Sequence, residues 1–224
     1  MKKKKQFGLI GKDIEYSFSR NFFLEKFASD KKSHEFDYKN YDIKSIKDVD
    51  SVFVQDNICG LNVTIPYKEE IVSHLDKISN QAKEIGSVNT ICFEKEKKVG
   101  YNTDLFGFTE SLKVNKIDNL DSVLILGTGG AAKTISYFCK KNDIPYNLVS
   151  RESSNLNLTY NDLNENQFFK KVLIVNCTPV GTFPKINSCP ELPYELIEKE
   201  NIFFDLVYNP PETLFMKKGK EIGC

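Results

Sequence analysis

The chain has 224 residues, of which 40% are hydrophobic and 28% are charged, a balance typical of a globular protein. Its 31 basic residues equal its 31 acidic residues, so the basic surface of a nucleic-acid-binding protein is not expected. No apolar run approaches the length of a membrane-spanning helix.

Cysteine and histidine positions give no pattern of metal ligands. The six cysteines contain no CxxC pair, and His34 and His74 lie far apart in the sequence. We therefore predict no metal site, and we expect free thiols in a cytoplasmic protein.

The first predicted strand covers residues 7–11, and two serines follow it. A helix is predicted over residues 20–29, with Ser19 placed to cap it and Ser17 two positions earlier. The ordinary roles are one cap and one loop serine. Hydroxyl groups at a helix N-terminus also favour an anion, which makes both serines candidates for binding one.

The most informative stretch of the first half is a strand predicted at residues 59–65, in which apolar residues alternate with Asn62 and Thr64. It follows a weak strand pattern at 34–41 and a helical pattern at 45–56. Lys68 comes just beyond, at the start of a stretch predicted to be helical through residue 85. Ligands of open α/β sheets bind beyond strand ends, so Lys68 is either a proton donor or a solvated lysine.

Another polar residue in an unexpected place is Asn89, in the strand predicted at residues 87–93, because asparagine is disfavoured in strands. Such misfits are typical of functional sites. A hairpin is predicted to lead into residues 99–101, and Asp104 then precedes a helix predicted over 105–114. Capping that helix is the ordinary role for Asp104.

The second half opens with a buried strand at residues 122–127 and a helix at about 131–141. Between them the chain fits G-x-G-x-x-G/A, the fingerprint of a dinucleotide site. Its residues are Gly127, Thr128, Gly129, Gly130 and Ala131. The glycines let backbone N–H groups approach a pyrophosphate.

The end of the next predicted strand, residues 145–149, indicates which cofactor is used. An NAD site usually has Asp or Glu here, whereas this chain has Ser150 and Arg151. A guanidinium can pair with the 2′-phosphate of NADP, so NADP is favoured, although Glu152 leaves NAD open.

Strands predicted at residues 172–176 and 202–208 complete an alternating β/α pattern with a parallel sheet. The predicted fold class is α/β with two domains and a cleft between them. We expect residues 1–104 to form an N-terminal α/β domain, which the resemblance described below implies is the substrate-binding and catalytic domain, and residues 105–224 to form a Rossmann-like dinucleotide-binding domain.

Taken together, these segments resemble the shikimate dehydrogenase family over nearly the whole chain. The motifs that carry the resemblance are Ser17-Phe18-Ser19, Asn62-Val63-Thr64-Ile65-Pro66-Tyr67-Lys68-Glu69, Val88-Asn89-Thr90, Asn102-Thr103-Asp104, Gly127-Thr128-Gly129-Gly130-Ala131 and Asp205-Leu206-Val207-Tyr208. The resemblance implies NADPH-dependent reduction of 3-dehydroshikimate to shikimate, on the pathway to chorismate and the aromatic amino acids.

The resemblance also implies roles for individual residues. Lys68 would be catalytic with Asp104 as its partner. The residues implied to bind substrate are Ser17, Ser19, Asn62, Thr64, Asn89 and Tyr208. Those implied to bind the cofactor are Gly127, Thr128, Gly129, Gly130, Ala131, Ser150, Arg151, Thr178 and Leu206.

Two alternatives remain open: a quinate or shikimate dehydrogenase with relaxed cofactor use, and a non-catalytic NADP-binding regulatory protein. The expected partners are a small-molecule substrate and NADP, with neither nucleic acid nor membrane, in a monomer or homodimer. The sequence to Cys224 lacks the helix with which relatives return to the first domain. We therefore expect an apolar patch on that domain.

Overall fold

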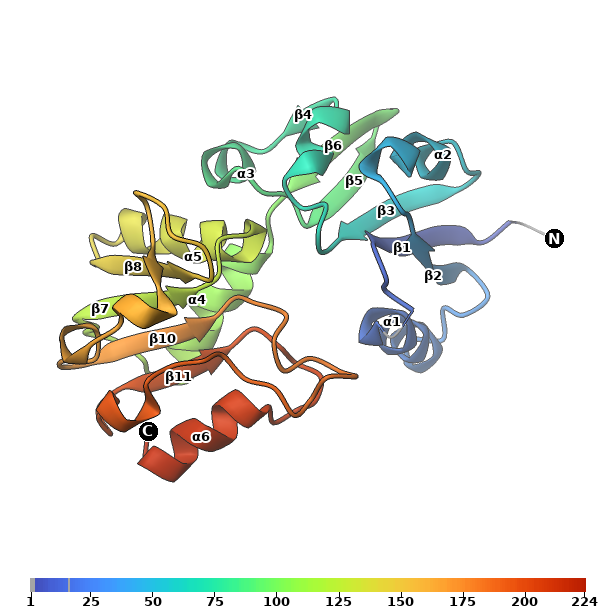
Figure 1. The fold of residues 1–224 in the computed structure, drawn as a ribbon. Coiled ribbons are helices and arrows are strands. Elements are labelled where there is room, and N and C mark those ends of the chain that lie inside the picture. Colours follow the sequence, from blue (N-terminus) through green and yellow to red (C-terminus); the bar gives the residue numbers. More distant parts are fainter. Residues whose placement is uncertain (1–2, 16) are drawn as a thin grey trace. The chain divides into compact units, whose positions relative to one another are not determined.

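The computed structural model describes residues 3–15 and 17–224, and the chain divides into two compact units, Met1–Asp104 and Leu105–Cys224 (Figure 1). Each unit contains one sheet. No helix of the described residues is long and apolar enough to cross a membrane.

The first unit is built on a mixed sheet of six strands in the order β2-β1-β3-β5-β6-β4. Strand β1 pairs in parallel with β2 and β3, whereas β5 is antiparallel to both β3 and β6. The strands are β1 (Lys5–Gly11), β2 (Phe36–Asp42), β3 (Ile58–Val63), β4 (Lys77–Ile78), β5 (Thr90–Glu94) and β6 (Lys97–Tyr101). The helices are α1 (Phe18–Ser29), α2 (Val49–Phe53) and α3 (Asn80–Ile85).

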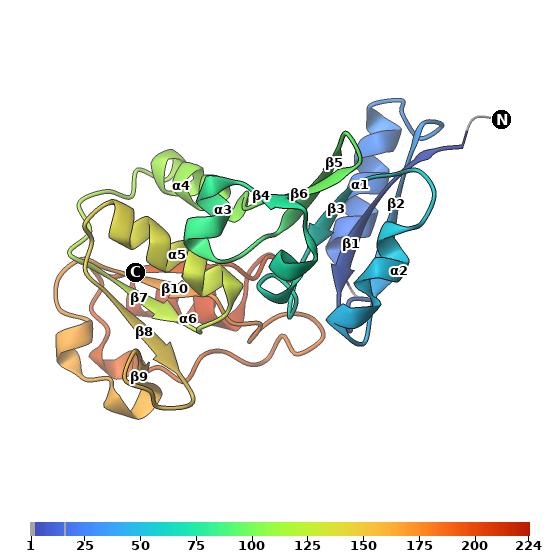
Figure 2. The ribbon, with the colours of Figure 1, turned by 90° about the horizontal axis from the view of Figure 1, so that it is seen from above.

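Helices α1 and α2 cover opposite faces of this sheet because neighbouring strand residues point to opposite sides (Figure 2). Ile10 packs in the cluster that contains Val49 and Val52 of α2. Leu9 packs instead in the cluster that Phe23 and Phe27 of α1 join.

The second unit contains a five-stranded, all-parallel sheet in the order β11-β10-β7-β8-β9. Its strands are β7 (Ser122–Leu126), β8 (Tyr146–Ser150), β9 (Leu158–Thr159), β10 (Val172–Asn176) and β11 (Ile202–Asp205). Its helices are α4 (Asp104–Val114), α5 (Gly130–Lys141) and α6 (Leu214–Ile222). The predicted α/β fold class, with a Rossmann-like second part, is confirmed.

Both faces of the parallel sheet are covered, which explains why its central strands are continuous apolar runs. Phe108 of α4 and Ile135 of α5 pack in the same cluster as Leu173. Phe215 of α6 packs with Ile174 in a second cluster, on the opposite face.

The helix predicted from residue 68 through 85 is wrong. The chain forms turns, a 3₁₀ helix at Glu70–His74, the short strand β4 and then α3. Leu75 is extended (φ −106°, ψ 147°), and the next residue, Asp76, accepts a hydrogen bond from the backbone N–H of Lys98. This pairing with the β5–β6 hairpin interrupts the helical pattern, and Ser79 caps α3 separately.

Other predicted boundaries also shift. The helix predicted at residues 45–56 is a 3₁₀ turn at Ile46–Asp48 followed by the five-residue α2. The strand predicted at 87–93 begins only at Thr90. The strand predicted at 202–208 stops at Asp205, because the carboxylate of Asp205 accepts the N–H of Val207 and turns the chain.

Candidate active site

Lys68 and Asp104 form the central ion pair of the first unit. Lys68 Nζ lies 2.7 Å from Asp104 Oδ2, and their side chains are 17% and 35% exposed. The backbone at Lys68 is fixed, because its carbonyl accepts the N–H of Val88 at 2.8 Å. The pair therefore joins the segment after β3 to the segment after β6 and leaves both charged groups within reach of a ligand.

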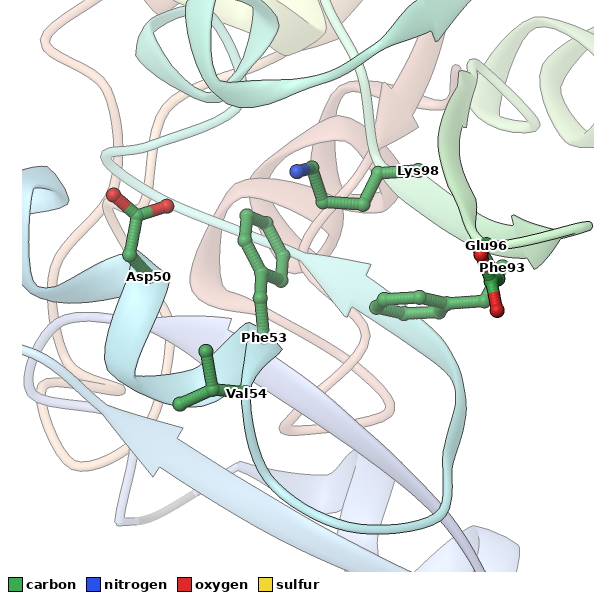
Figure 3. A pocket seen from close by; sticks show the side chains of 6 residues that line it. All are labelled: Asp50, Phe53, Val54, Phe93, Glu96 and Lys98. Carbon is green, nitrogen blue, oxygen red and sulfur yellow. The ribbon is translucent and has the colours of Figure 1, made fainter.

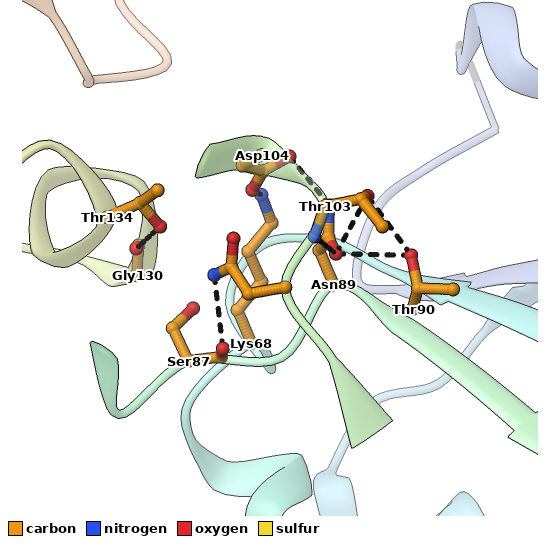
Figure 4. A network of polar contacts seen from close by, with 9 residues as sticks. Lys68, Ser87, Asn89, Thr90, Thr103, Asp104, Gly130 and Thr134 are labelled. Atoms are coloured by element: carbon orange, nitrogen blue, oxygen red, sulfur yellow. Dashed lines mark hydrogen bonds and ion pairs between the residues drawn. The ribbon is translucent and has the colours of Figure 1, made fainter. Parts of the chain in front are cut away.

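Asn89 holds the other side of the Asp104 carboxylate (Figure 4). Its Nδ2 donates to Asp104 Oδ1 at 2.6 Å, and the side chain is only 8% exposed. Its Oδ1 accepts the backbone N–H of Thr103 at 2.8 Å. Asn89 thus fixes the loop and the carboxylate together, which explains an asparagine beside a strand.

Asp104 is the first residue of α4, where the N–H groups of the first turn favour a negative charge. The structure thus brings together three residues that the sequence singled out from separate segments: Lys68, Asn89 and Asp104. An ammonium group next to a hydrogen-bonded carboxylate can donate a proton to an oxygen that gains negative charge.

Asn62 lies on β3, on the same side of the sheet as α1. Its Oδ1 accepts a hydrogen bond from the hydroxyl of Tyr38 at 2.9 Å, and the Tyr38 ring stacks on Phe23 with centroids 4.6 Å apart. Tyr38 is 1% exposed and was not identified from the sequence. It orients the Asn62 amide from a neighbouring part of the sheet.

Thr64 lies just after β3, and its N–H donates to the carbonyl of Ile10. Its methyl group packs against Gly11, where an added Cβ would lie 2.6 Å from Thr64 Cγ2. Glycine at position 11 is therefore needed to let the loop after β1 pass beside Thr64.

Ser17, not Ser19, caps the helix that follows the first strand. The helix α1 begins at Phe18, and Ser17 Oγ accepts the N–H of Ser19 at 3.3 Å. The helix begins earlier than predicted, so the cap moves to Ser17. Both serines lie at the N-terminus of α1, as the anion-binding hypothesis requires.

Asp42 anchors the loop that leads to these serines. Its two carboxylate oxygens accept the backbone N–H groups of Asp13 and Ile14, at 3.0 and 2.9 Å. The Ile14 carbonyl in turn accepts the N–H of Ser17 at 2.9 Å. Asp42 was not identified from the sequence, because this contact depends on the pairing of β1 with β2.

The glycine turn of the second unit fits a phosphate group. Gly127 has φ +109°, a conformation that side chains disfavour, and an added Cβ would lie 3.1 Å from Thr178. Gly129 precedes α5 without any side-chain cap, and nothing lies within 4 Å of the position its Cβ would take. The first N–H groups of α5 near Gly130 and Ala131 are thus open to an anion, with Thr128 in the same turn.

Ser150 and Arg151 lie at the end of β8, in a turn held by Asn157. Ser150 Oγ donates to the carbonyl of Glu152 at 2.6 Å and accepts from Asn157 Nδ2 at 2.9 Å. Its hydroxyl therefore shapes the turn. Arg151 is exposed, as is Glu152 next to it.

Thr178, Leu206 and Tyr208 follow β10 and β11, whose carboxyl ends are adjacent in the sheet. Thr178 Oγ1 donates to Asn176 Oδ1 at 2.6 Å, and the Leu206 N–H donates to the Asn176 carbonyl. Tyr208 is 62% exposed. It belongs to the second unit, whereas the serines implied to share its ligand belong to the first.

Two hollows of the first unit are lined by neither Lys68 nor Asp104, although Asn62 and Tyr38 line the second of them. One, of about 350 Å³, is lined by Phe53, Phe93 and Lys98, among others (Figure 3). The other, of about 260 Å³, is almost wholly apolar and lies where Phe7 and Phe27 face β3 and β5. Among the described residues no cluster of three or more potential metal ligands exists.

Comparison with known proteins finds the family that the sequence motifs resemble, and full-length relatives match both units. The family described as "Shikimate dehydrogenase substrate binding domain" matches residues 9–91. The chain is 36% identical to the shikimate dehydrogenase (NADP(+)) of Methanococcus vannielii, over 96% of this chain and 82% of that protein.

Solved structures agree. Shikimate dehydrogenase 1 from Peptoclostridium difficile matches with a TM-score of 0.83 and 33% identity, over 98% of this chain and 83% of that one. The enzyme from Thermus thermophilus in complex with NADP(H) and shikimate matches with a TM-score of 0.81 and 28% identity, over 97% and 84%.

Proposed function

Since this chain belongs to the shikimate dehydrogenase family and is an NADP-dependent oxidoreductase of the shikimate pathway, we propose that Lys68 and Asp104 are its catalytic residues. The reaction reduces 3-dehydroshikimate to shikimate. The observation that carries the proposal is the 2.7 Å ion pair, fixed by Asn89 and reachable from solvent.

The proton chemistry follows from this pair. A bound NADPH would supply a hydride to the carbonyl carbon of the substrate, and negative charge would then develop on the carbonyl oxygen. The Lys68 ammonium stabilises that charge and donates the proton that completes the alcohol. Asp104 orients the ammonium and accepts a hydrogen bond from a substrate hydroxyl, and the same groups act in reverse when shikimate is oxidised.

Substrate binding is assigned to polar groups around the pair. Ser17 and Ser19, at the N-terminus of α1, would bind the substrate carboxylate, with Tyr208 as a third contact. Asn62, Thr64 and Asn89 would bind the ring hydroxyls. We accordingly assign residues 1–104 to substrate binding and catalysis.

Residues 105–224 are assigned to NADP. The open glycine turn at Gly127–Ala131 and the uncapped start of α5 fit the pyrophosphate. Arg151 would pair with the 2′-phosphate. Ser150 would support that contact through the shape of its turn, and Thr178 and Leu206 would line the nicotinamide end.

The direct test is NADPH oxidation by the purified chain with 3-dehydroshikimate, followed by absorbance at 340 nm. Parallel assays replace NADPH by NADH and, in the reverse direction, shikimate by quinate. Turnover that requires both NADPH and 3-dehydroshikimate supports the proposal. NADP binding without turnover would instead support a regulatory protein, and equal rates with quinate or NADH would support a relaxed dehydrogenase.

We place the enzyme in the cytoplasm, because its described cysteines are all free thiols, as a reducing compartment maintains. Its proposed ligands are the small-molecule substrate and NADP. Light scattering coupled to gel filtration distinguishes the monomer from the homodimer, the two states that the sequence leaves open.

A further inference from the structure

A buried polar link joins two loops of the second unit that carry proposed cofactor and substrate contacts. Asn176, at the end of β10, is 0% exposed. Its Nδ2 donates to Asp205 Oδ1 at 3.0 Å and to the carbonyl of Val180 at 3.2 Å. Its Oδ1 accepts the N–H and the hydroxyl of Thr178. One amide therefore shapes the loop after β10 and ties it to the end of β11.

Asp205 continues the link into the next loop. Its Oδ1 also accepts the N–H of Val207 at 2.9 Å, and its Oδ2 accepts the hydroxyl of Thr213 at 2.6 Å. Thr213 caps α6 by accepting the N–H of Met216. Burial raises the pKa of Asp205, although hydrogen bonds from Thr213, Val207 and Asn176 oppose that rise. The loop 206–212 is thus held at both ends by one carboxylate.

We propose that Asn176 and Asp205 are positioning residues that fix the Thr178 loop against the Leu206–Tyr208 loop. They thereby set the geometry of the nicotinamide end of the cofactor site and of Tyr208. This inference rests on the proposed function. Neither side chain needs to touch a ligand: each acts through hydrogen bonds that hold the loops carrying the proposed contacts.

The location of the link supports this role. The sheet itself is held by the β10–β11 pairing and by apolar side chains, so its strands do not need a buried amide–carboxylate pair. A buried polar network destabilises the fold unless every member is hydrogen-bonded, and a fully hydrogen-bonded network fixes one geometry. Here the hydrogen bonds converge on the two loops at the carboxyl ends of the strands, where ligands of such sheets bind.

The chain offers a matched control for the variant Asn176→Ala. Asn201 is an equally buried amide (1% exposed) that donates to the carbonyls of Phe168 and Glu198, next to the amino end of β11. Both variants lose a buried amide from the same unit, but only the first loses the link between the two loops.

The experiment compares the binding of NADP with the binding of 2′,5′-ADP, which lacks the nicotinamide, by calorimetry on the whole protein. We expect Asn176→Ala to weaken NADP about tenfold or more and to change 2′,5′-ADP less than twofold. Asn201→Ala should change neither. Asp205→Asn, which keeps the side-chain shape, should also weaken NADP and leave 2′,5′-ADP nearly unchanged. It replaces Asn176→Ala in the experiment if Asn176→Ala does not fold.

Amide hydrogen exchange supplies a readout without ligand. The proposal expects faster exchange at Thr178, Val180 and Val207 in Asn176→Ala, with the interior of β7 unchanged. Equal loss of both ligands, or normal NADP binding in Asn176→Ala and Asp205→Asn, would overturn it. The wild-type assay with 3-dehydroshikimate tests the proposed function separately. Normal wild-type turnover together with normal NADP binding by both variants would overturn this inference and leave the proposed function standing.

Discussion

Asn89 reaches Asp104 across the end of the first sheet, with its Nδ2 2.6 Å from Asp104 Oδ1, opposite the oxygen that binds Lys68. The carboxylate is therefore held from two sides by a neutral donor and a cation. A group held this way keeps one orientation, which proton transfer over short distances requires.

Replacing Asn89 should impair turnover through Asp104. Asn89→Ala should lower kcat about tenfold to a hundredfold, since hydrogen bonds to charged groups contribute about 1.5–3 kcal/mol. Steady-state kinetics of Asn89→Ala, Asp104→Asn and the double variant form a thermodynamic cycle. If the two losses simply add, Asn89 does not act through Asp104.

Lys68→Ala should lower kcat by about 10²–10⁴-fold, the range typical of losing a positioned proton donor. Binding of shikimate should change much less, because other polar groups hold the ring. Lys83→Ala, which removes an exposed lysine of α3, is the control and should leave kcat unchanged. Near-normal turnover of Lys68→Ala would remove Lys68 from the mechanism.

Asp42→Asn should raise KM for shikimate about tenfold while leaving KM for NADP unchanged, because it releases the loop that positions Ser17. An amide in place of the carboxylate turns one acceptor of a backbone N–H into a donor. For a shikimate analogue whose carboxylate is replaced by an amide, the KM should rise less in Asp42→Asn than the KM for shikimate does. An equal rise for both compounds would indicate a general disturbance of the first unit instead.

Arg151→Ala should raise KM for NADPH about tenfold or more, since a charged hydrogen bond to the 2′-phosphate contributes about 1.5–3 kcal/mol. NADH has no 2′-phosphate, so its use should hardly change. Lys141→Ala, at the far end of α5, is a suitable control. Parallel weakening of both cofactors would mean that Arg151 stacks on the adenine or has only a structural role.

Cys139 should resist thiol reagents in the native enzyme. It is 0% exposed, and burial raises the pKa of its thiol to about 12, so almost no thiolate forms at pH 8. Mass spectrometry after alkylation at pH 8 should find Cys139 unmodified and Cys59 modified, with Cys139 labelled only after denaturation. Early labelling of Cys139 in folded protein would contradict the packing of α5.

The sequence predicted the elements best where one physical requirement dominates. The strand predicted at 172–176, four apolar residues followed by Asn176, matches β10 to the residue, because a strand buried on both faces favours such an apolar run. The glycine turn was recognisable for a similar reason, since Gly127 needs a conformation that side chains disfavour.

Local sequence patterns could not predict the side-chain contacts between different strands. Asp42 and Tyr38 support loop and strand residues that are 24 to 29 positions away, and only the pairing of β1 with β2 and β3 brings them close. The same holds for Asn176 and Asp205, which are 29 positions apart. Their residue types were unremarkable in the sequence, because a buried acceptor looks like a surface one until its donors are known.

The boundary between the compact units falls immediately after Asp104. Both members of the proposed acid–base pair, and the asparagine that hydrogen-bonds the carboxylate, are therefore encoded before codon 105. A chimaeric gene that exchanged the codons from 105 onward for those of another dinucleotide-binding unit would keep the codons for all three residues, while the first turn of α4 after Asp104 would come from the new unit. Under the proposed assignment, cofactor preference and proton chemistry would thus be encoded in separate stretches of the gene, which a chimaera can exchange one at a time.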